Sequence, residues 1–210
     1  MNFINKDILV LNIGIGNIQS VVNAINYLGY NCIVGNSKND IDNAKAIILP
    51  GVGAFGEAID LMKEQDILEH LKESISNRNI YFLGICLGMQ LLFEKSFEYG
   101  THKGFGLFKG TVNRMNFSNR LPHVGWNDIE IEKETILFQG IDQKSDFYFD
   151  HSFSVICDKE LVSSFVEYQG KRVVASVEKD NIFGVQFHPE KSQFIGIELI
   201  NNFLKKVNNA

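Results

Sequence analysis

The sequence predicts an α/β fold built on an open, mixed but mainly parallel sheet with helices on both faces. Short apolar runs alternate with segments of helical periodicity over residues 8–95, and glycines separate several of them. Alternation of strand and helix at this spacing is typical of right-handed crossovers between parallel strands. From about Gly104 the helical periodicity gives way to apolar runs joined by short turns. These runs predict further strands before one last helix.

The first half of the chain is expected to alternate between strands and amphipathic helices. Apolar runs of strand length predict strands at residues 8–13, 32–34, 46–49 and 80–85. Apolar residues that recur every three or four positions predict helices. These helices are expected over residues 17–28, as one or two helices across 59–75, and from 87 to about 95.

The second half is expected to contribute several short strands and a C-terminal helix. The strands are predicted at residues 111–115, 124–131, 147–149, 163–168, 172–177 and 182–187, and the helix at about 192–207. The sequence has no internal repeat, low-complexity tract or linker that would mark a second domain. We therefore expect a single domain over residues 1–210.

Composition excludes several classes of protein. The net charge is −5 and Lys and Arg form no long basic run, which argues against a nucleic-acid partner. The three cysteines have spacings that fit neither a metal site nor a disulfide framework. Met1–Asp7 lacks a secretory pattern, and no apolar run is long enough to span a bilayer. We expect a cytoplasmic protein without a metal, cofactor or membrane association.

The segment around Cys86 is the most informative part of the chain. An apolar run leads to a cysteine between Gly84 and Gly88, and a helical pattern follows at once. This arrangement is typical of a nucleophile on a tight strand-to-helix turn. We expect the first glycine to allow the bend and the second to let the helix pack close to the strand. The positive end of that helix would stabilise a thiolate.

A second segment supplies the base and the carboxylate that a thiol nucleophile needs. His188 and Glu190 lie two residues apart at the end of a predicted strand, with Pro189 between them. Residues i and i+2 of an extended segment point the same way, so Glu190 can orient the imidazole. Cys32 and Cys157 lack such surroundings and are interpreted as packing residues.

These residues resemble the signature of class I, or triad, glutamine amidotransferases. Gly84-x-Cys86-x-Gly88-x-Gln90 is followed downstream by His188-Pro189-Glu190, in the family's order. The segment 49–55, with its Gly-Val-Gly, resembles the family's oxyanion-strand loop. Residues 16–21, the Pro-His-Val-Gly-Trp-Asn at 122–127 and Lys191-Ser192 are similar to one branch, the glutaminase subunits of imidazole glycerol phosphate synthase. The resemblance covers nearly the whole chain and implies a flavodoxin-like fold.

The resemblance implies hydrolysis of L-glutamine to glutamate and ammonia. Cys86 would attack the side-chain amide and form a thioester, His188 would move the protons, and Glu190 would hold His188. The oxyanion would be bound by backbone N–H groups of Leu87, Val52 and Gly53. The candidates for binding the glutamine substrate are Gln90, Glu98, His151 and Ser152.

Ammonia is mostly protonated in neutral water, so a synthase that consumes it must receive it directly. The resemblance implies a separate (β/α)8-barrel cyclase subunit, docked as a heterodimer over the active-site face, that forms imidazole glycerol phosphate and an aminoimidazole carboxamide ribotide in histidine biosynthesis. The candidates for that face are Trp126, Asn127 and Lys191. The free subunit is expected to be a poor glutaminase.

Three alternatives stay open on the sequence. A paralogous glutaminase feeding a different synthase would have the same site residues. A stand-alone cysteine hydrolase of the same fold would share the turn at Cys86 and the histidine, without needing a partner. A nucleotide-binding module is suggested by the glycines of residues 14–17, which follow the first strand, although Gln19 stands where a third glycine would complete the dinucleotide pattern.

Overall fold

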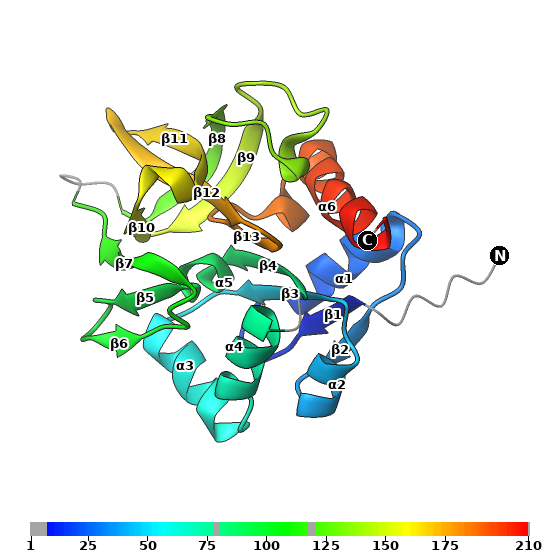
Figure 1. Cartoon of the computed structure of the whole chain (residues 1–210). Helices are drawn as coiled ribbons and strands as arrows, with labels where there is room; N and C mark the ends of the chain where they lie inside the picture. Colours follow the sequence, from blue (N-terminus) through cyan, green and yellow to red (C-terminus); the bar gives the residue numbers. More distant parts are fainter. Residues whose placement is uncertain (1–7, 78–79, 117–120, 210) are drawn as a thin grey trace.

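The structure, a computed structural model, describes residues 8–77, 80–116 and 121–209, so Met1–Asp7 lies outside the described part. Within that part the strands form a nine-stranded and a four-stranded sheet (Figure 1). The strands of the larger sheet are β1 (Ile8–Leu11), β2 (Ile33–Gly35), β3 (Ala46–Gly51), β4 (Tyr81–Cys86), β8 (His123–Ile131), β9 (Asp146–His151), β11 (Val162–Tyr168), β12 (Lys171–Lys179) and β13 (Ile182–Val185). The smaller sheet contains β5 (Phe93–Ser96), β6 (His102–Lys103), β7 (Phe108–Arg114) and β10 (Phe153–Cys157).

The larger sheet is mixed, with the order β2-β1-β3-β4-β13-β12-β11-β8-β9. Its pairings from β2 to β13 are parallel, and those from β13 to β9 are antiparallel. The described helices are α1 (Ile18–Tyr27), α2 (Lys38–Asp42), α3 (Phe55–Glu64), α4 (Leu68–Asn77), α5 (Leu87–Gln90) and α6 (Gln193–Asn208), with short 3-10 helices η1 (Ile136–Phe138), η2 (Lys159–Leu161) and η3 (Pro189–Lys191).

The parallel strands bury both of their faces, as their continuous apolar runs require. Leu9 and Leu11 face a core that includes buried side chains of α3 and α4. Ile8 and Val10 face the opposite core, to which α1 and α6 contribute. Figure 1 shows these two pairs of helices on opposite sides of the sheet. The predicted open α/β fold, with helices on both faces, is confirmed.

The helix predicted from residue 87 to about 95 is wrong in its extent. The observed α5 ends at Gln90, and the chain enters β5 at Phe93. Phe93 pairs in parallel with Phe108 of β7, and the two rings pack edge to face with centroids 5.8 Å apart. Packing against a distant strand therefore overrides the local helical pattern.

Close contacts between backbones hold the segment around Cys86 in place. A Cβ on Gly88 would lie 2.0 Å from the carbonyl oxygen of Leu49 on β3, and a Cβ on Gly84 would lie 2.4 Å from the carbonyl oxygen of Gly88. The expected close packing at Gly88 is therefore present. The bend was expected at Gly84 but falls on Cys86, whose φ is 54°. Gly84 is needed because α5 passes directly over it.

We predict that Gly88→Ala destabilises the protein by about 3 kcal/mol, because the new methyl group would overlap the Leu49 carbonyl. Alanine is the better helix former by about 1 kcal/mol, so helix propensity alone would give the opposite sign. Urea unfolding measures the difference. Gly140→Ala is the control, since Gly140 has a positive φ of 73° but open space around it. Equal losses at both sites would contradict the close-packing argument.

Candidate active site

Cys86 ends β4 in a strained backbone conformation, and its sulfur lies at the carboxyl ends of the parallel strands. Its φ of 54° and ψ of −105° lie in a region that residues with a Cβ rarely adopt. The strain is maintained because β4 on one side and α5 on the other fix the chain. Register places Gly51 of β3 directly beside Cys86. The turn after β3 and the sulfur therefore share one edge of the sheet, as expected.

His188 follows β13 and is held through its main chain. Its N–H donates to the carbonyl of Tyr148 on β9 at 2.8 Å. The hydroxyl of Ser192 donates to the His188 carbonyl at 2.6 Å and accepts the Tyr148 N–H at 3.0 Å. The side chain of His188 is 2% exposed, and its Nδ1 lies 2.8 Å from Oε1 of Glu190, which is 1% exposed. Glu190 therefore contacts the imidazole, but it does so from η3 and not from the extended segment that the sequence predicted.

The charges around His188 favour its imidazolium. Burial acts to lower the pKa of His188, but interactions with Cys86 and Glu190 outweigh it and raise that pKa well above the ordinary value. Glu190 occupies Nδ1, so Nε2 is the nitrogen left to exchange a proton with the sulfur. Within the described residues Nε2 forms no hydrogen bond of ordinary geometry, although Cys86 is close enough to act on the ring.

The sulfur also has a polar neighbour, Gln186, that was not among the residues predicted for the site. Gln186 is fully buried, and its Nε2 donates to Sγ of Cys86 at 3.5 Å. Its Oε1 accepts from Nε2 of Gln90 at 3.0 Å, and that nitrogen also donates to the carbonyl of Phe153 at 3.2 Å. A polar residue inside the apolar run 182–187 was the signal for Gln186, since buried amides need partners.

A cavity of about 240 Å³ opens beside the sulfur. It brings together every residue predicted for oxyanion and substrate binding. The lining residues are Val52, Gly53, Cys86, Leu87, Gln90, Glu98, Pro122, Asp150, His151, Ser152 and Phe153. The cavity has room for a ligand the size of an amino acid.

Two of the candidate substrate-binding residues have partners within the protein. Glu98 accepts the Phe55 N–H at 2.8 Å through Oε2, at the first turn of α3. The ring of His151 has both nitrogens within hydrogen-bonding distance of partners, the Phe153 carbonyl at 2.8 Å and His123 at 3.1 Å. A ligand would therefore meet the main chain of His151 and Ser152 rather than the imidazole.

The candidate interface residues lie on two faces of β8 and on η3. Trp126 is 47% exposed and packs edge to face on Tyr148, with centroids 6.1 Å apart. Nζ of Lys191 lies 5.4 Å from the centre of the same ring. Asn127 points to the opposite face of β8, where Nδ2 donates to the Glu167 carbonyl at 3.1 Å. Trp126 and Lys191 thus gather around Tyr148, and Asn127 does not.

Other chemistries find little support in the described residues. Within residues 8–77, 80–116 and 121–209, no group of three or more His, Cys, Asp or Glu side chains could hold a metal ion. No helix in the same ranges is long and apolar enough to cross a membrane. Burial raises the pKa of Cys32, and burial together with Asp158 raises that of Cys157 to about 11, which makes both thiols poor nucleophiles.

Comparison with known proteins agrees with this geometry. The family model for glutamine amidotransferase class-I matches residues 9–207. The chain belongs to the class-I glutamine amidotransferases. It is 45% identical over 192 residues to "Imidazole glycerol phosphate synthase subunit HisH 1" of Campylobacter jejuni strain RM1221, covering 90% of this chain and 95% of that protein. It is 42% identical over 196 residues to "Imidazole glycerol phosphate synthase subunit HisH" of Bacillus anthracis strain CDC 684, covering 93% of each.

Solved structures of other proteins share the fold. A crystal structure described as a glutamine amidotransferase superposes with a TM-score of 0.75 at 18% identity, over 95% of this chain and 98% of that one. A chain of the Thermotoga maritima PurLQS structure superposes with a TM-score of 0.76 at 20% identity, over 96% and 99%. At these identities the superpositions establish the architecture.

We predict that Glu190→Gln lowers the pKa of His188, because the amide lacks the charge that stabilises the imidazolium. The folded pKa of His188 lies above the unfolded value of about 6.5, so this stabilisation is complete at lower pH and is lost as pH rises through the folded pKa. In Glu190→Gln the loss should occur at lower pH. NMR titration of His188 and urea unfolding between pH 6 and 10 measure both effects.

The control for this prediction is Glu69→Gln on α4, where the carboxylate is 71% exposed and pairs with Lys72. Surface pairs contribute little, so its stability profile should follow the wild type. An unchanged titration of His188 in Glu190→Gln would show that Glu190 does not stabilise the imidazolium.

Proposed function

We propose that the chain is the single-domain glutaminase subunit of imidazole glycerol phosphate synthase, acting in the cytoplasm. The observation that carries the proposal is the meeting of Cys86, His188 and Glu190 beside one small cavity. The similarity to subunits that bear this name supports the choice of synthase. The substrate would be L-glutamine, and no cofactor would be needed.

In the first half of the reaction, the Cys86 sulfur attacks the side-chain amide carbon of glutamine. His188 takes the thiol proton through Nε2 and delivers it to the departing ammonia, leaving a glutamyl thioester. Glu190 keeps Nδ1 protonated, so Nε2 always faces the reacting atoms. In the second half, water activated by His188 attacks the thioester and releases glutamate.

The oxyanion of each tetrahedral intermediate would be bound by backbone N–H groups. Leu87 begins α5, and the first N–H groups of a helix have no acceptor within that helix. Val52 and Gly53 line the cavity from the turn after β3, and Gly53 has a φ of 106° that suits a close backbone approach. One such donor is typically worth about 3 kcal/mol of barrier.

The remaining cavity residues would recognise the substrate's amino-acid end. The Glu98 carboxylate would attract the α-ammonium group. Main-chain groups of His151 and Ser152 would bind the substrate from the opposite wall. Gln90 would contribute from α5, although its amide nitrogen is already engaged with Gln186 and Phe153.

The partner would be a (β/α)8-barrel cyclase that receives the ammonia as a heterodimer. We place Trp126, Asn127 and Lys191 at the contact. Trp126 and Lys191 flank Tyr148, whose main chain holds His188. Phe194 is 78% exposed and lines the same surface hollow as Trp126, so it would extend the contact. Exposed aromatic side chains of this kind are typical anchors of interfaces.

The three alternative functions predict different experimental results. A paralogous glutaminase would have the same site and a different synthase as its partner. A stand-alone cysteine hydrolase would work at full rate without a partner. A nucleotide-binding module would keep its ligand when Cys86 is replaced.

We predict that Cys86→Ala lowers ammonia release by at least about 10³-fold, because the nucleophile is lost. Cys157→Ala is the control, since that thiol lies away from the cavity. Ammonia release should be slow for the isolated wild type and rise when the cyclase and its substrate are added. Full activity of the isolated chain would favour a stand-alone hydrolase. Failure of the cyclase to bind or activate it would favour a paralogue.

We predict that Trp126→Ala weakens binding to the cyclase by about 2 kcal/mol, or roughly 30-fold, through loss of an aromatic anchor. Isothermal titration of the two subunits measures the affinity. Val34→Ala is the control, because Val34 is similarly exposed at 45% but lies on β2, at the other end of the sheet order. Equal affinities for the two variants would exclude Trp126 from the contact.

A further inference from the structure

The imidazole rings of two buried histidines beside the cavity have no part in the proposed chemistry. His123 on β8 and His151 on β9 face each other in register, and they are 2% and 6% exposed. Nδ1 of His123 lies 3.1 Å from Nε2 of His151. The His123 ring is stacked on Phe149 and Tyr168, with centroids 4.7 Å and 3.9 Å away. Burial of two imidazoles in contact needs a physical reason.

The hydrogen-bond partners fix which nitrogen of each ring carries the proton. The Phe153 carbonyl can only accept, so Nδ1 of His151 must donate to it at 2.8 Å. Burial keeps His151 neutral and lowers its pKa to about 3, so its Nε2 carries no proton. That nitrogen must therefore accept from Nδ1 of His123.

The same argument assigns the proton of His123 and its bond to Asn127, at the end of this series of hydrogen bonds farther from Cys86. Burial lowers the pKa of His123 to about 4, so its ring is also neutral and its Nε2 must accept. Nδ2 of Asn127 lies 3.4 Å from that nitrogen and is its donor. Every bond then points one way, from Asn127 through His123 and His151 to the carbonyl of Phe153.

The Phe153 carbonyl joins this series of hydrogen bonds to the sulfur. It accepts from Nε2 of Gln90, which also donates to Oε1 of Gln186. With its oxygen turned to Gln90, Gln186 presents an N–H to Sγ of Cys86 at 3.5 Å. A donated hydrogen bond stabilises a thiolate, whereas an oxygen in the same place would repel it. The orientation of two buried amides thus bears directly on the nucleophile.

We propose that His123 and His151 are positioning residues, whose fixed tautomers hold the Phe153 carbonyl where it orients Gln90 and Gln186 to donate to the Cys86 thiolate. This proposal rests on the proposed thiolate chemistry, and adds to it a second source of thiolate stabilisation besides His188. Neither histidine touches the reacting atoms.

Two substitutions at position 123 separate bond direction from side-chain size. In His123→Asn the amide nitrogen can take the place of Nδ1 and still donate to His151. In His123→Asp the carboxylate can only accept, so His151 must donate from Nε2. It then either gives up the Nδ1 bond to Phe153 or becomes charged beside His188.

The first measurement is the ¹⁵N spectrum of the histidines in the wild-type chain. We expect protonated Nδ1 and bare Nε2 on both His123 and His151, and a proton on Nε2 of His151 would overturn the proposal. This readout needs no variant and no enzymatic activity.

The second measurement is the rate at which iodoacetamide alkylates Cys86 at pH 7, followed by peptide mass analysis. We expect His123→Asp to slow it about tenfold, and His123→Asn to stay within about twofold of the wild type. His70→Asn is the control, since His70 lies on α4 and contacts Asp42. Of the titratable side chains facing the sulfur, His188 and its partner Glu190 are unchanged in all variants.

Equal alkylation rates in the Asp and Asn variants would overturn the positioning role. Should His123→Asp fail to fold, Asn127→Asp tests the same series of hydrogen bonds at its other end. Its carboxylate presents an acceptor, in place of a donor, to Nε2 of His123. Alkylation and the ¹⁵N spectrum do not depend on glutamine. A wild type that passes both tests but releases no ammonia with its partner would contradict the proposed function and leave the positioning role intact.

Discussion

The site depends on the close approach of three backbone segments at the carboxyl ends of β3 and β4. α5 lies so near both strands that side chains at Gly84 and Gly88 would overlap carbonyl oxygens. A Cβ on Gly51 would likewise lie 3.0 Å from Cβ of Leu87. This contact fixes the strained backbone of Cys86. It also sets the turn after β3 beside the sulfur, where backbone N–H groups can face a bound carbonyl.

Burial of charge is the second constraint on the site. A buried carboxylate such as Glu190 is costly unless it is paired, and His188 supplies the pair. Interactions with Cys86 and Glu190 together raise the pKa of His188 well above its ordinary value, so the three groups are coupled to one another. Hydrogen bonds with the Tyr148 main chain and the Ser192 hydroxyl hold the His188 backbone, and so keep its ring between Cys86 and Glu190.

Sequence patterns predicted the central strands, their flanking helices and the catalytic set, because each has a local signal. The periodicity of residues 17–28 became α1, with Asn17 as its N-cap. The short strands β5, β6 and β10 were missed. β5 and β10 are both stabilised by pairing with β7, and the two residues of β6 are too short a run to give a pattern of their own. Gln186 was missed as a site residue because its role depends on Cys86 and Gln90, which lie about a hundred residues away.

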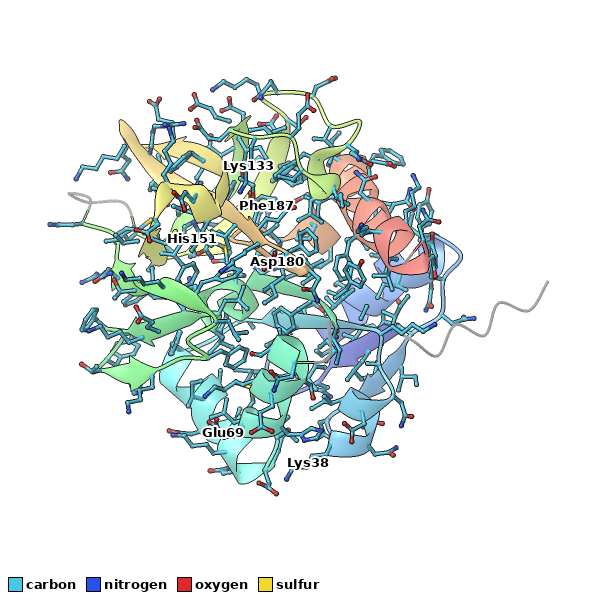
Figure 2. All side chains as sticks on the ribbon, viewed as in Figure 1. Lys38, Glu69, Lys133, His151, Asp180 and Phe187 are labelled. Carbon is cyan, nitrogen blue, oxygen red and sulfur yellow. The ribbon has the colours of Figure 1, made fainter. Side chains whose placement is uncertain are left out.

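Few residues separate His188, the proposed base, from Trp126 on the proposed partner surface. Gln186 and His188 both follow β13, and both side chains interact with Cys86. Phe187, labelled in Figure 2, is fully buried in the core. The position of His188 is set by the Tyr148 carbonyl, and the Tyr148 ring packs on the exposed Trp126. In the proposed complex, a partner that contacts Trp126 would therefore act on Tyr148, whose main chain holds His188. One ring contact and one hydrogen bond would then couple docking to the proposed chemistry.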